Sequence, residues 1–321
     1  MLLGSDHVRV RVPATSANLG PGFDALGLAL GIYDDVEVRA LGSAELLVEV
    51  TGEGADELPL DEEHLIVRSL RYALDFVGAP QVGLHLRSHN RIPHGRGMGS
   101  SAGAVVAGVL AARMLIAEPE VLYNTTAFLL ATEIEGHPDN AAPAILGGAT
   151  VAWRSADGPH AASLTVHPDL APILLIPSTR LSTRTARAVL PASVPHADAA
   201  FTAGRAAILT EALCRRPDLL MQATEERLHQ SYRAEVMPES WQLLNALRER
   251  DLPAVISGAG PTVLVLGTRP DVERQQAVCE EVAAAVAIDF SQDPAARTTW
   301  RVVQPGVSER GARSVRVGPA A

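Results

Sequence analysis

The chain has 321 residues, of which 47% are apolar and 20% charged, and this length predicts a folded protein of two domains rather than one ordinary core. Its formal net charge of −10 excludes a nucleic-acid-binding protein that presents a broad basic face. All 27 basic residues are arginine, and the absence of lysine excludes the Walker A loop, the protein-kinase motifs and lysine Schiff-base chemistry.

The first half of the chain predicts a mixture of strands and helices. Alternating valines and arginines indicate a strand at residues 8–12, which Pro13 should end, followed by turns over residues 14–24. Further strands are expected at residues 35–39, 45–50, 82–87 and 149–153, and helices at residues 65–77, 104–116 and 121–135.

The second half predicts an α+β unit of its own. Strands are expected at residues 173–176, 254–257, 263–266 and 300–303, helices at residues 205–214, 219–228, 241–250 and 272–287, and a turn at residues 293–297. The turn-rich residues 155–159 suggest a boundary between domains at 1–155 and 156–321, with a cleft shared between them.

The cysteines and the N-terminal residues indicate the cellular compartment of the protein. Cys214 and Cys279 show no zinc-site or disulfide spacing, which fits a reducing compartment. The start of the chain lacks the apolar core of a signal peptide, and the longest apolar run, residues 102–117, carries Arg113 and is too short to span a bilayer. We therefore expect a cytoplasmic protein without a membrane partner.

The strongest chemical signal is a glycine- and serine-rich loop. Gly95, Gly97 and Gly99 stand at alternate positions and are followed by Ser100, Ser101 and a small-residue helix. Glycines leave backbone N–H groups unshielded, and a helix N-terminus attracts anions, so the loop predicts a phosphate site. The spacing GxGxG differs from the dinucleotide fingerprint, and a purely structural turn is the competing interpretation.

Two further segments are rich in glycine and proline. Residues 13–24 include Asn18 and Asp24, and residues 257–262 form a glycine turn between two predicted strands. Taken alone, each is typical of an ordinary turn.

The three segments together, in this order, resemble the three signature motifs of the GHMP (galacto-, homoserine, mevalonate and phosphomevalonate) small-molecule kinases. Residues 13–24, 135–140, 183–187 and 231–233 resemble the homoserine branch in particular. The resemblance implies an α+β, two-domain GHMP kinase fold: an N-terminal domain like domain 2 of ribosomal protein S5 and a ferredoxin-like C-terminal domain. It implies transfer of the ATP γ-phosphoryl group to the hydroxyl of L-homoserine, a step of threonine biosynthesis, between the two domains.

The resemblance also implies the nucleotide and metal sites. Mg²⁺ would be held by Ser101 and Glu135, with Glu133 as the competing carboxylate, since one carboxylate and one hydroxyl beside the triphosphate suffice. His64 stands where the family usually has an asparagine that helps hold the adenine. The residues expected to contact ATP are His64, Pro93, His94, Gly95, Arg96, Gly97, Met98, Gly99, Ser100, Ser101, Ala102 and Gly103.

L-Homoserine carries an ammonium, a carboxylate and a hydroxyl. Asp24 is expected to pair with the ammonium, with hydrogen bonds from Asn18 and Asn140. Arg187 and Arg233 offer the planar forks that suit a carboxylate. His137 completes the expected substrate pocket.

Asn18, Asp24, Thr183 and Arg187 are the candidates for a catalytic role. Phosphoryl transfer depends mainly on positioning and charge neutralisation, so no general base is required. Asp24 as the base is the weaker alternative, because an ammonium partner would make its carboxylate less basic.

Two other functions remain open. One is a GHMP kinase for a different substrate, which the paired Asp24, Arg187 and Arg233 disfavour because they suit an amino acid. The other is a nucleotide-binding regulator without catalysis, which would be expected to lack Ser101 or Glu135. The family also suggests a homodimer.

Overall fold

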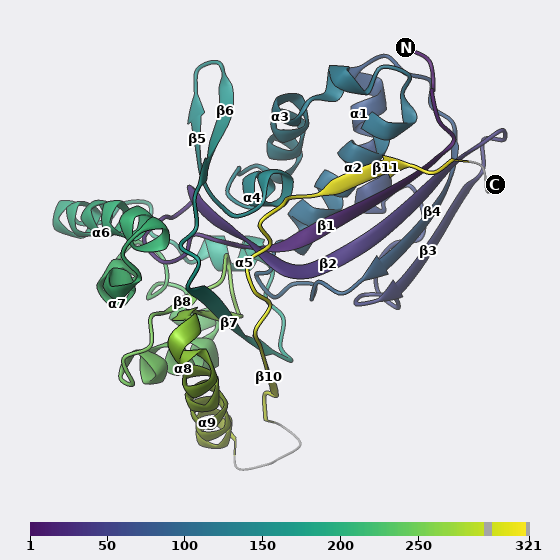
Figure 1. Ribbon diagram of the computed structural model, residues 1–321. Coiled ribbons are helices and arrows are strands. Elements are labelled where there is room, and N and C mark those ends of the chain that lie inside the picture. Colours follow the sequence, from purple (N-terminus) through teal and green to yellow (C-terminus); the bar gives the residue numbers. More distant parts are fainter. Residues whose placement is uncertain (292–296, 319–321) are drawn as a thin grey trace.

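The structure, a computed structural model, describes residues 1–291 and 297–318. Figure 1 shows two units side by side, each built on its own β-sheet with helices packed against it. No helix among the described residues has both the length and the apolar character needed to cross a membrane. Cys214 and Cys279 are free thiols.

The first unit contains ten elements that follow one another along the chain. They are β1 (His7–Ala17), β2 (Leu26–Leu41), β3 (Leu46–Gly52), α1 (Leu65–Phe76), β4 (Gly83–Asn90), α2 (Ser100–Leu115), α3 (Asn124–Glu135), α4 (Ala141–Leu146), β5 (Ala149–Ser155) and β6 (Gly158–Leu164), with the short 3-10 helix η1 (Pro119–Leu122) before α3.

The second unit contains the next elements along the chain. They are β7 (Leu170–Pro177), α5 (Thr183–Ala188), α6 (His196–Cys214), α7 (Leu220–Ala223), α8 (Pro238–Arg248), β8 (Ala254–Ile256), β9 (Val263–Thr268), α9 (Val272–Phe290) and β10 (Trp300–Val303), with 3-10 helices η2 (Pro217–Leu219), η3 (Ala234–Val236) and η4 (Arg269–Asp271). The last described strand, β11 (Arg313–Arg316), belongs to the first unit.

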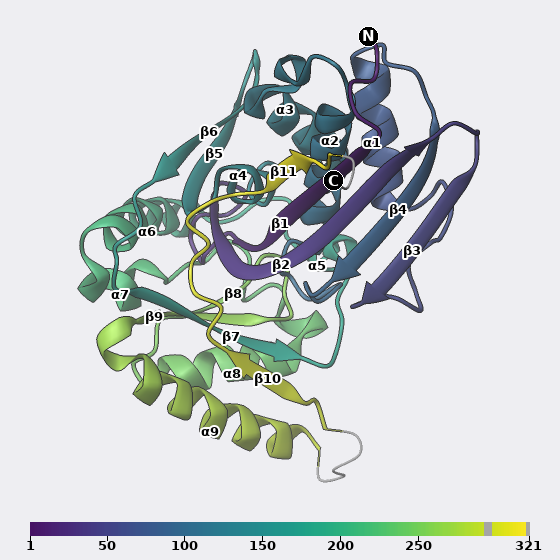
Figure 2. The same ribbon diagram turned by 45° about the vertical axis from the view of Figure 1, so that its right-hand side comes forward.

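Seven of the described strands form the first sheet, in the order β11-β1-β2-β4-β3, with β5 beside β2 and β6 beside β5. All neighbours are antiparallel except β3 and β4, which are joined through α1 and run parallel. Figure 2 shows α1 and α2 on one face of this sheet, where they enclose the first hydrophobic core. The C-terminal strand β11 returns from the second unit to lie along β1.

The first strand continues beyond Pro13, where the sequence predicted its end. The β1–β2 pairing shifts register between Pro13 and Ala14 and then resumes as far as Ala17. Proline has no N–H to donate, and a bulge is one of the places where a strand accommodates it. The continuation matters for function because it delivers residues 14–18 to the middle of the molecule.

Helix α2 is buried along most of its length, and its small residues make this possible. At Gly108 a side chain would overlap the backbone carbonyl of Ile66 and the backbone of Leu70 in α1. The small side chains therefore allow α1 and α2 to approach closely above the sheet. This packing fixes the N-terminal end of α2, which begins at Ser100 rather than at residue 104 as predicted.

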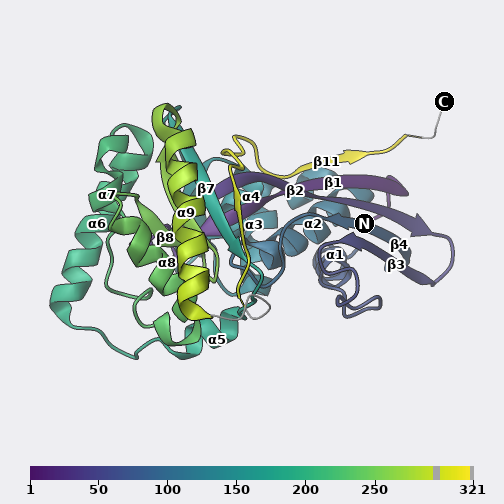
Figure 3. The same ribbon diagram turned by 90° about the horizontal axis from the view of Figure 1, so that it is seen from below.

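The second sheet has the strand order β10-β7-β9-β8, all antiparallel. With one crossover between β7 and β8 and another between β9 and β10, this is the βαββαβ arrangement of a ferredoxin-like unit and confirms the predicted fold. Alternate residues of β7 face opposite layers. Ile173 and Leu175 pack with α8 and α9, while Leu174 and Ile176 pack with α6 and with Leu28 of the first unit. Figure 3 shows the two units meeting along this layer.

Several predicted boundaries differ from the structure. The helix expected at residues 219–228 is reduced to α7, because Thr224 and the turns after it lead the chain back toward the first unit. Strand β11 was not predicted. The proposed domain boundary at residue 155 lies at the turn of the β5–β6 hairpin, whose two strands both belong to the first sheet. We therefore propose a boundary after Leu164. Residues 293–296 of the predicted turn lie outside the described residues.

Candidate active site

A cavity of about 260 Å³ lies between the two units. The first unit contributes the strand β1, the loop before α2, the first turns of α2 and the end of α3. The second unit contributes α5 and the segment around Gly258. Every residue predicted to bind ATP, metal or substrate lines this cavity except Asp24, which contacts the lining residue Arg187.

Three segments that the sequence singled out meet at this cavity: residues 13–24, 93–103 and 257–262. The Ser257 Oγ lies 2.7 Å from the Gly97 carbonyl oxygen. The Asn18 side chain donates to the Gly258 carbonyl oxygen at 2.8 Å. The motifs are therefore one hydrogen-bonded assembly, although they lie far apart in the sequence.

The glycine-rich loop adopts a conformation that its sequence anticipated. Gly95, Gly97 and Gly99 have φ angles of +64°, +68° and +66°, a region that residues with a side chain rarely occupy. A side chain at Gly97 would also overlap the Ser257 carbonyl, and one at Gly99 the Thr15 hydroxyl. With glycine at the N-cap, no side chain caps α2, so its first backbone N–H groups remain available to an anion.

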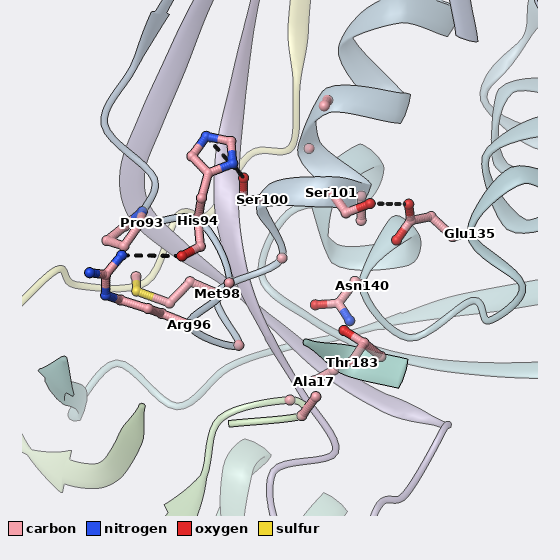
Figure 4. Close-up of a pocket in the computed structure, with 18 of the residues that line it drawn as sticks. Ala17, Pro93, His94, Arg96, Met98, Ser100, Ser101, Glu135, Asn140 and Thr183 are labelled. Atoms are coloured by element: carbon pink, nitrogen blue, oxygen red, sulfur yellow. Dashed lines mark hydrogen bonds between the residues drawn. The ribbon is translucent and has the colours of Figure 1, made fainter. Parts of the chain in front are cut away.

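The side chains of this loop have different roles. Arg96 donates to the carbonyl groups of residues 177 and 178, at 2.7 and 2.9 Å, and so ties the loop to the end of β7. Met98 is buried in the core. His94 Nδ1 lies 3.0 Å from Ser100 Oγ, and Figure 4 shows this pair at the wall of the cavity. Of these side chains, His94 and Ser100 are therefore the polar groups best placed to meet a ligand.

His64 precedes α1 and is buried, and it lines the cavity, whose other lining residues include the apolar Val12, Val36, Leu58 and Leu65. Both of its ring nitrogens are buried without a hydrogen-bond partner. Burial lowers the pKa of this imidazole, and the nearby His94 lowers it further, which favours the neutral form. The ring thus offers one donor and one acceptor to whatever enters this end of the cavity.

Ser101 and Glu135 face each other from α2 and from the end of α3 (Figure 4). The Ser101 hydroxyl donates to Glu135 Oε1 at 2.6 Å. Burial raises the pKa of Glu135, and the hydrogen bond from Ser101 partly opposes this. The competing Glu133 lies on the exposed side of α3, where it accepts a hydrogen bond from Tyr72 at 2.9 Å and does not line the cavity.

Asn18 and Asp24 lie in a tight turn after β1, with φ angles of +68° and +54°. Asn18 Oδ1 accepts a hydrogen bond from the Asp24 backbone N–H at 2.9 Å, which orients the carboxylate. Both carboxylate oxygens then accept from Arg187 of α5, at 2.6 and 3.2 Å. Asp24 and Arg187, which were predicted to bind opposite ends of the substrate, are therefore ion-paired with each other.

Arg233 is buried, with 1% of its surface exposed, yet it lines the cavity. Its Nε donates to the Ala186 carbonyl at 3.0 Å, and its Nη1 lies 3.1 Å from both the Gly258 carbonyl oxygen and His229 Nδ1. Among the described residues, no carboxylate oxygen lies within 4.0 Å of its nitrogens. Burial, followed by the positive charge of Arg187, lowers the Arg233 pKa to about 10, so it remains charged at neutral pH.

His137, Asn140 and Thr183 complete the wall next to the arginines. His137 Nδ1 lies 3.1 Å from the buried carboxylate of Asp139, which raises the His137 pKa. Thr15 Oγ1 donates to Asn140 Oδ1 at 2.7 Å and fixes the orientation of that amide. Thr183, the first residue of α5, is exposed and lines the cavity together with Asn140 (Figure 4).

The sequence did not identify two members of this site, Phe23 and His229. The Phe23 ring stacks on the His229 imidazole with 5.0 Å between the ring centres. The guanidinium groups of Arg187 and Arg233 lie 5.7 and 5.6 Å from the centre of the Phe23 ring. The spacing of four residues between His229 and Arg233 was an available signal, but in an isolated sequence it is too common to be decisive.

The chain matches two protein-family models, the GHMP kinases N terminal domain over residues 64–148 and the GHMP kinases C terminal domain over residues 208–286. It is 53% identical over 289 residues to the homoserine kinase of Streptomyces coelicolor, covering 90% of this chain and 93% of the relative. The chain belongs to the GHMP kinase family, in its homoserine kinase branch. Another homoserine kinase, from Leifsonia xyli, is 45% identical over 316 residues, which cover 96% of this chain and 97% of the relative.

The fold agrees with this assignment. A crystal structure of homoserine kinase from Cytophaga hutchinsonii superposes with a TM-score of 0.81, covering 97% of this chain and 98% of the other at 23% identity. The predicted family and its two-domain α+β fold are thus confirmed. The individual site residues remain predictions, now supported by their convergence on one cavity.

Proposed function

We propose that this chain transfers the γ-phosphoryl group of ATP to the hydroxyl of L-homoserine, giving O-phospho-L-homoserine and ADP. The observation that carries the proposal is the buried guanidinium of Arg233, which lines the same cavity as the glycine-rich loop and has no carboxylate partner among the described residues. The acidic groups that act on it, Asp24, Glu226 and Asp139, lie beyond 4.0 Å, and a buried cation without an anion in contact is unfavourable. The carboxylate of an amino-acid substrate supplies that contact.

The nucleotide fits the other end of the cavity. The uncapped first turn of α2 and the three left-handed glycines offer backbone N–H groups to phosphate oxygens. The apolar walls around His64 suit a flat heteroaromatic base, and the two free ring nitrogens of His64 provide hydrogen bonds to its edge. No lysine exists in the chain to neutralise the phosphates, so the loop and a metal ion take over that role.

The donor set fits Mg²⁺. Ser101 and Glu135 lie in contact within the cavity and supply one hydroxyl and one carboxylate oxygen. Mg²⁺ usually takes one or two carboxylates, with phosphate oxygens and water as its other ligands. When bound there, the metal neutralises charge on the transferring phosphoryl group.

The amino-acid end combines charges of both signs. Asp24, already held by Arg187 and by the Asn18 amide, provides the negative charge that faces an ammonium group. Arg233 provides the positive charge for the carboxylate. Asn140 and Thr183 line the same cavity as the Ser101–Glu135 pair, and we place the hydroxyl that meets the phosphoryl group among them (Figure 4).

The residues support direct transfer without a general base from the protein. Both oxygens of Asp24 accept hydrogen bonds from Arg187, and Asp139 Oδ1 lies 3.1 Å from His137 Nδ1, so both carboxylates are already engaged by neighbouring side chains. Holding the hydroxyl in line with the phosphoryl group supplies most of the acceleration that this reaction needs. The hydroxyl proton leaves late in the transfer and passes to an oxygen of the transferred phosphoryl group.

A coupled ADP-release assay tests the proposal. The purified protein is incubated with ATP and Mg²⁺ and with L-homoserine, mevalonate, galactose or shikimate in parallel. We expect turnover with L-homoserine far above the other acceptors. Turnover of a different acceptor, or of none, overturns the proposed substrate.

Two further expectations belong to this proposal. We expect the protein to be cytoplasmic, because free thiols such as those of Cys214 and Cys279 are usual in a reducing compartment. A homodimer stays a prediction, which sedimentation velocity of the purified protein would test.

A further inference from the structure

His229 is fully buried next to the amino-acid end of the cavity and has no part in the mechanism described above. Its Nε2 lies 2.8 Å from the Gly20 carbonyl oxygen, and its Nδ1 lies 3.1 Å from Arg233 Nη1. The nearest acidic side chain, Glu226, is 3.9 Å from Nε2. Both ring nitrogens are therefore committed to specific partners.

The partners fix the protonation of the ring. A carbonyl oxygen only accepts hydrogen bonds, so Nε2 must carry a proton. A guanidinium only donates, so Nδ1 must be unprotonated and accept from Arg233. His229 is thus the neutral Nε2–H tautomer, and burial, which lowers its pKa, acts in the same direction.

The two hydrogen bonds join the two sides of the amino-acid site. Gly20 lies in the turn that carries Asn18 and Asp24, the groups that face an ammonium. Arg233 faces the carboxylate. Phe23, from the same turn as Gly20, stacks on the His229 ring and keeps it from rotating.

We propose that His229 is a positioning residue, which holds the Arg233 guanidinium in register with the Asp24 turn so that both ends of an amino-acid substrate are bound at a fixed separation. The inference rests on the proposed function, because it names the device that orients Arg233 for that substrate. Arg233 donates through Nε to Ala186 and through Nη1 to His229 and Gly258. Without the imidazole, Nη1 keeps only the Gly258 carbonyl as an acceptor, and the buried guanidinium is held less firmly.

Two near-isosteric variants separate the two hydrogen bonds. In His229→Asn the amide oxygen takes the place of Nδ1 and can accept from Arg233, but the bond to Gly20 is lost. In His229→Gln the amide NH₂ reaches the place of Nε2 and keeps the Gly20 bond, but Nδ1 is not replaced. Each variant is assayed for the KM of L-homoserine, the KM of ATP and kcat, together with its melting temperature.

We expect His229→Gln to raise the KM for L-homoserine roughly ten- to hundredfold, the usual effect of losing a buried hydrogen bond to a charged group. The rise should be much smaller in His229→Asn, and the KM for ATP should be unchanged in both. Equal KM values for L-homoserine in the wild type and His229→Gln would overturn the inference. A purely structural role, seen as equal increases in the KM values for L-homoserine and ATP and equal decreases in melting temperature in both variants, would overturn it as well.

A double variant tests whether His229 acts through Arg233. In the Arg233→Ala background, His229→Gln should raise the KM for L-homoserine no further, because no guanidinium remains to be positioned. Multiplicative effects of the two substitutions would overturn the inference. Failure of the proposed function itself is seen separately, since the wild-type protein would then not turn over L-homoserine.

Discussion

Asp24 and Arg187 are 163 residues apart in the chain and form a two-point ion pair in which both carboxylate oxygens accept from the guanidinium, at 2.6 and 3.2 Å. The pair joins the turn after β1 to α5 across the two units. Because the Arg187 fork is already directed at Asp24, we propose that Arg187 lies on the ammonium side of the site and that Arg233, which contacts no carboxylate among the described residues, binds the substrate carboxylate. The two arginines, equivalent in the sequence interpretation, should therefore respond differently to substitution.

Arg233→Ala should weaken L-homoserine binding by about 2–5 kcal/mol, much of it from leaving a desolvated carboxylate unpaired. Arg187→Ala should cost less, since Arg187 is about one-third exposed and its charge is already balanced by Asp24. The KM for L-homoserine measures both effects. Arg184→Ala, at an exposed position on the same helix as Arg187, is the matched control and should change nothing.

The same variants test the placement of the two arginines. Neither substitution should alter ATP affinity, measured by titration of ATP in the absence of L-homoserine. A loss of ATP affinity in Arg233→Ala would place this side chain at the nucleotide end of the cavity and contradict the assignment.

The metal assignment predicts a contrast between two neighbouring glutamates. Glu135→Gln removes the carboxylate that faces Ser101 and should lower kcat and raise the Mg²⁺ concentration for half-maximal activity by about tenfold or more. Glu133→Gln removes only an exposed hydrogen bond to Tyr72 and should leave the Mg²⁺ dependence unchanged. A larger effect from Glu133→Gln would transfer the ligand role to that residue.

Local sequence pattern predicted the parts of the site that depend on local backbone chemistry. The alternate glycines at Gly95, Gly97 and Gly99 permit the tightly turned backbone that the loop adopts, so its conformation could be predicted locally. The choice between Glu133 and Glu135 could not be predicted in this way. The two residues lie on different faces of one helix, and only the tertiary packing decides which face is directed toward the cavity. The family resemblance favoured Glu135, and the packing of α3 places it there.

Long-range relationships were beyond the sequence. The pairing of Asp24 with Arg187 and the contact between Gly20 and His229 each join segments more than 160 residues apart. Strand β11 was missed for a related reason. Its four residues, with arginine at both ends, resemble an exposed loop in the sequence. They can be predicted as a strand only when the free edge of β1, with which they pair, is known.

Asp34 gives the protein a specific pH dependence of stability. It is 6% exposed and accepts backbone hydrogen bonds from Arg91 and Ile92, at 2.6 and 2.9 Å, where the chain enters the glycine-rich loop. Burial raises its pKa from 3.8 to about 6, so the folded protein binds a proton here more tightly than the unfolded chain does. The stability that this residue contributes is therefore full below about pH 4 and is lost as the pH rises through about 6.

Asp34→Asn removes this titration while keeping an oxygen that accepts both backbone hydrogen bonds. The difference in the free energy of unfolding, variant minus wild type, should increase between pH 4 and pH 8 by up to about 3 kcal/mol, the value of a shift of about two pKa units. Urea unfolding at several pH values measures it. Parallel pH profiles for the two proteins would show that Asp34 is not responsible.

Two glycines of the phosphate loop should respond in opposite directions to alanine. Gly97→Ala places a side chain at φ +68° and against the Ser257 carbonyl, and should destabilise the fold by more than about 2 kcal/mol and impair ATP binding. Gly103→Ala lies inside α2, where the nearest atoms, of Ile92 and Val12, would be 3.7 Å from the new carbon. It should stabilise the protein by about 0.5–1 kcal/mol, the helix preference of alanine over glycine.

His64→Leu should separate stability from nucleotide binding. Both ring nitrogens of His64 are buried without partners, so replacing the ring by an apolar side chain removes unsatisfied polar groups, and the melting temperature should stay the same or rise. If the ring holds the nucleotide base, the KM for ATP should increase by about tenfold, corresponding to the loss of a buried hydrogen bond. The KM for L-homoserine, which binds at the other end of the cavity, should not change. A variant that gains stability and keeps its ATP affinity would show that the base is held by the apolar walls alone, and that His64 only fills space beside Val36 and Leu65.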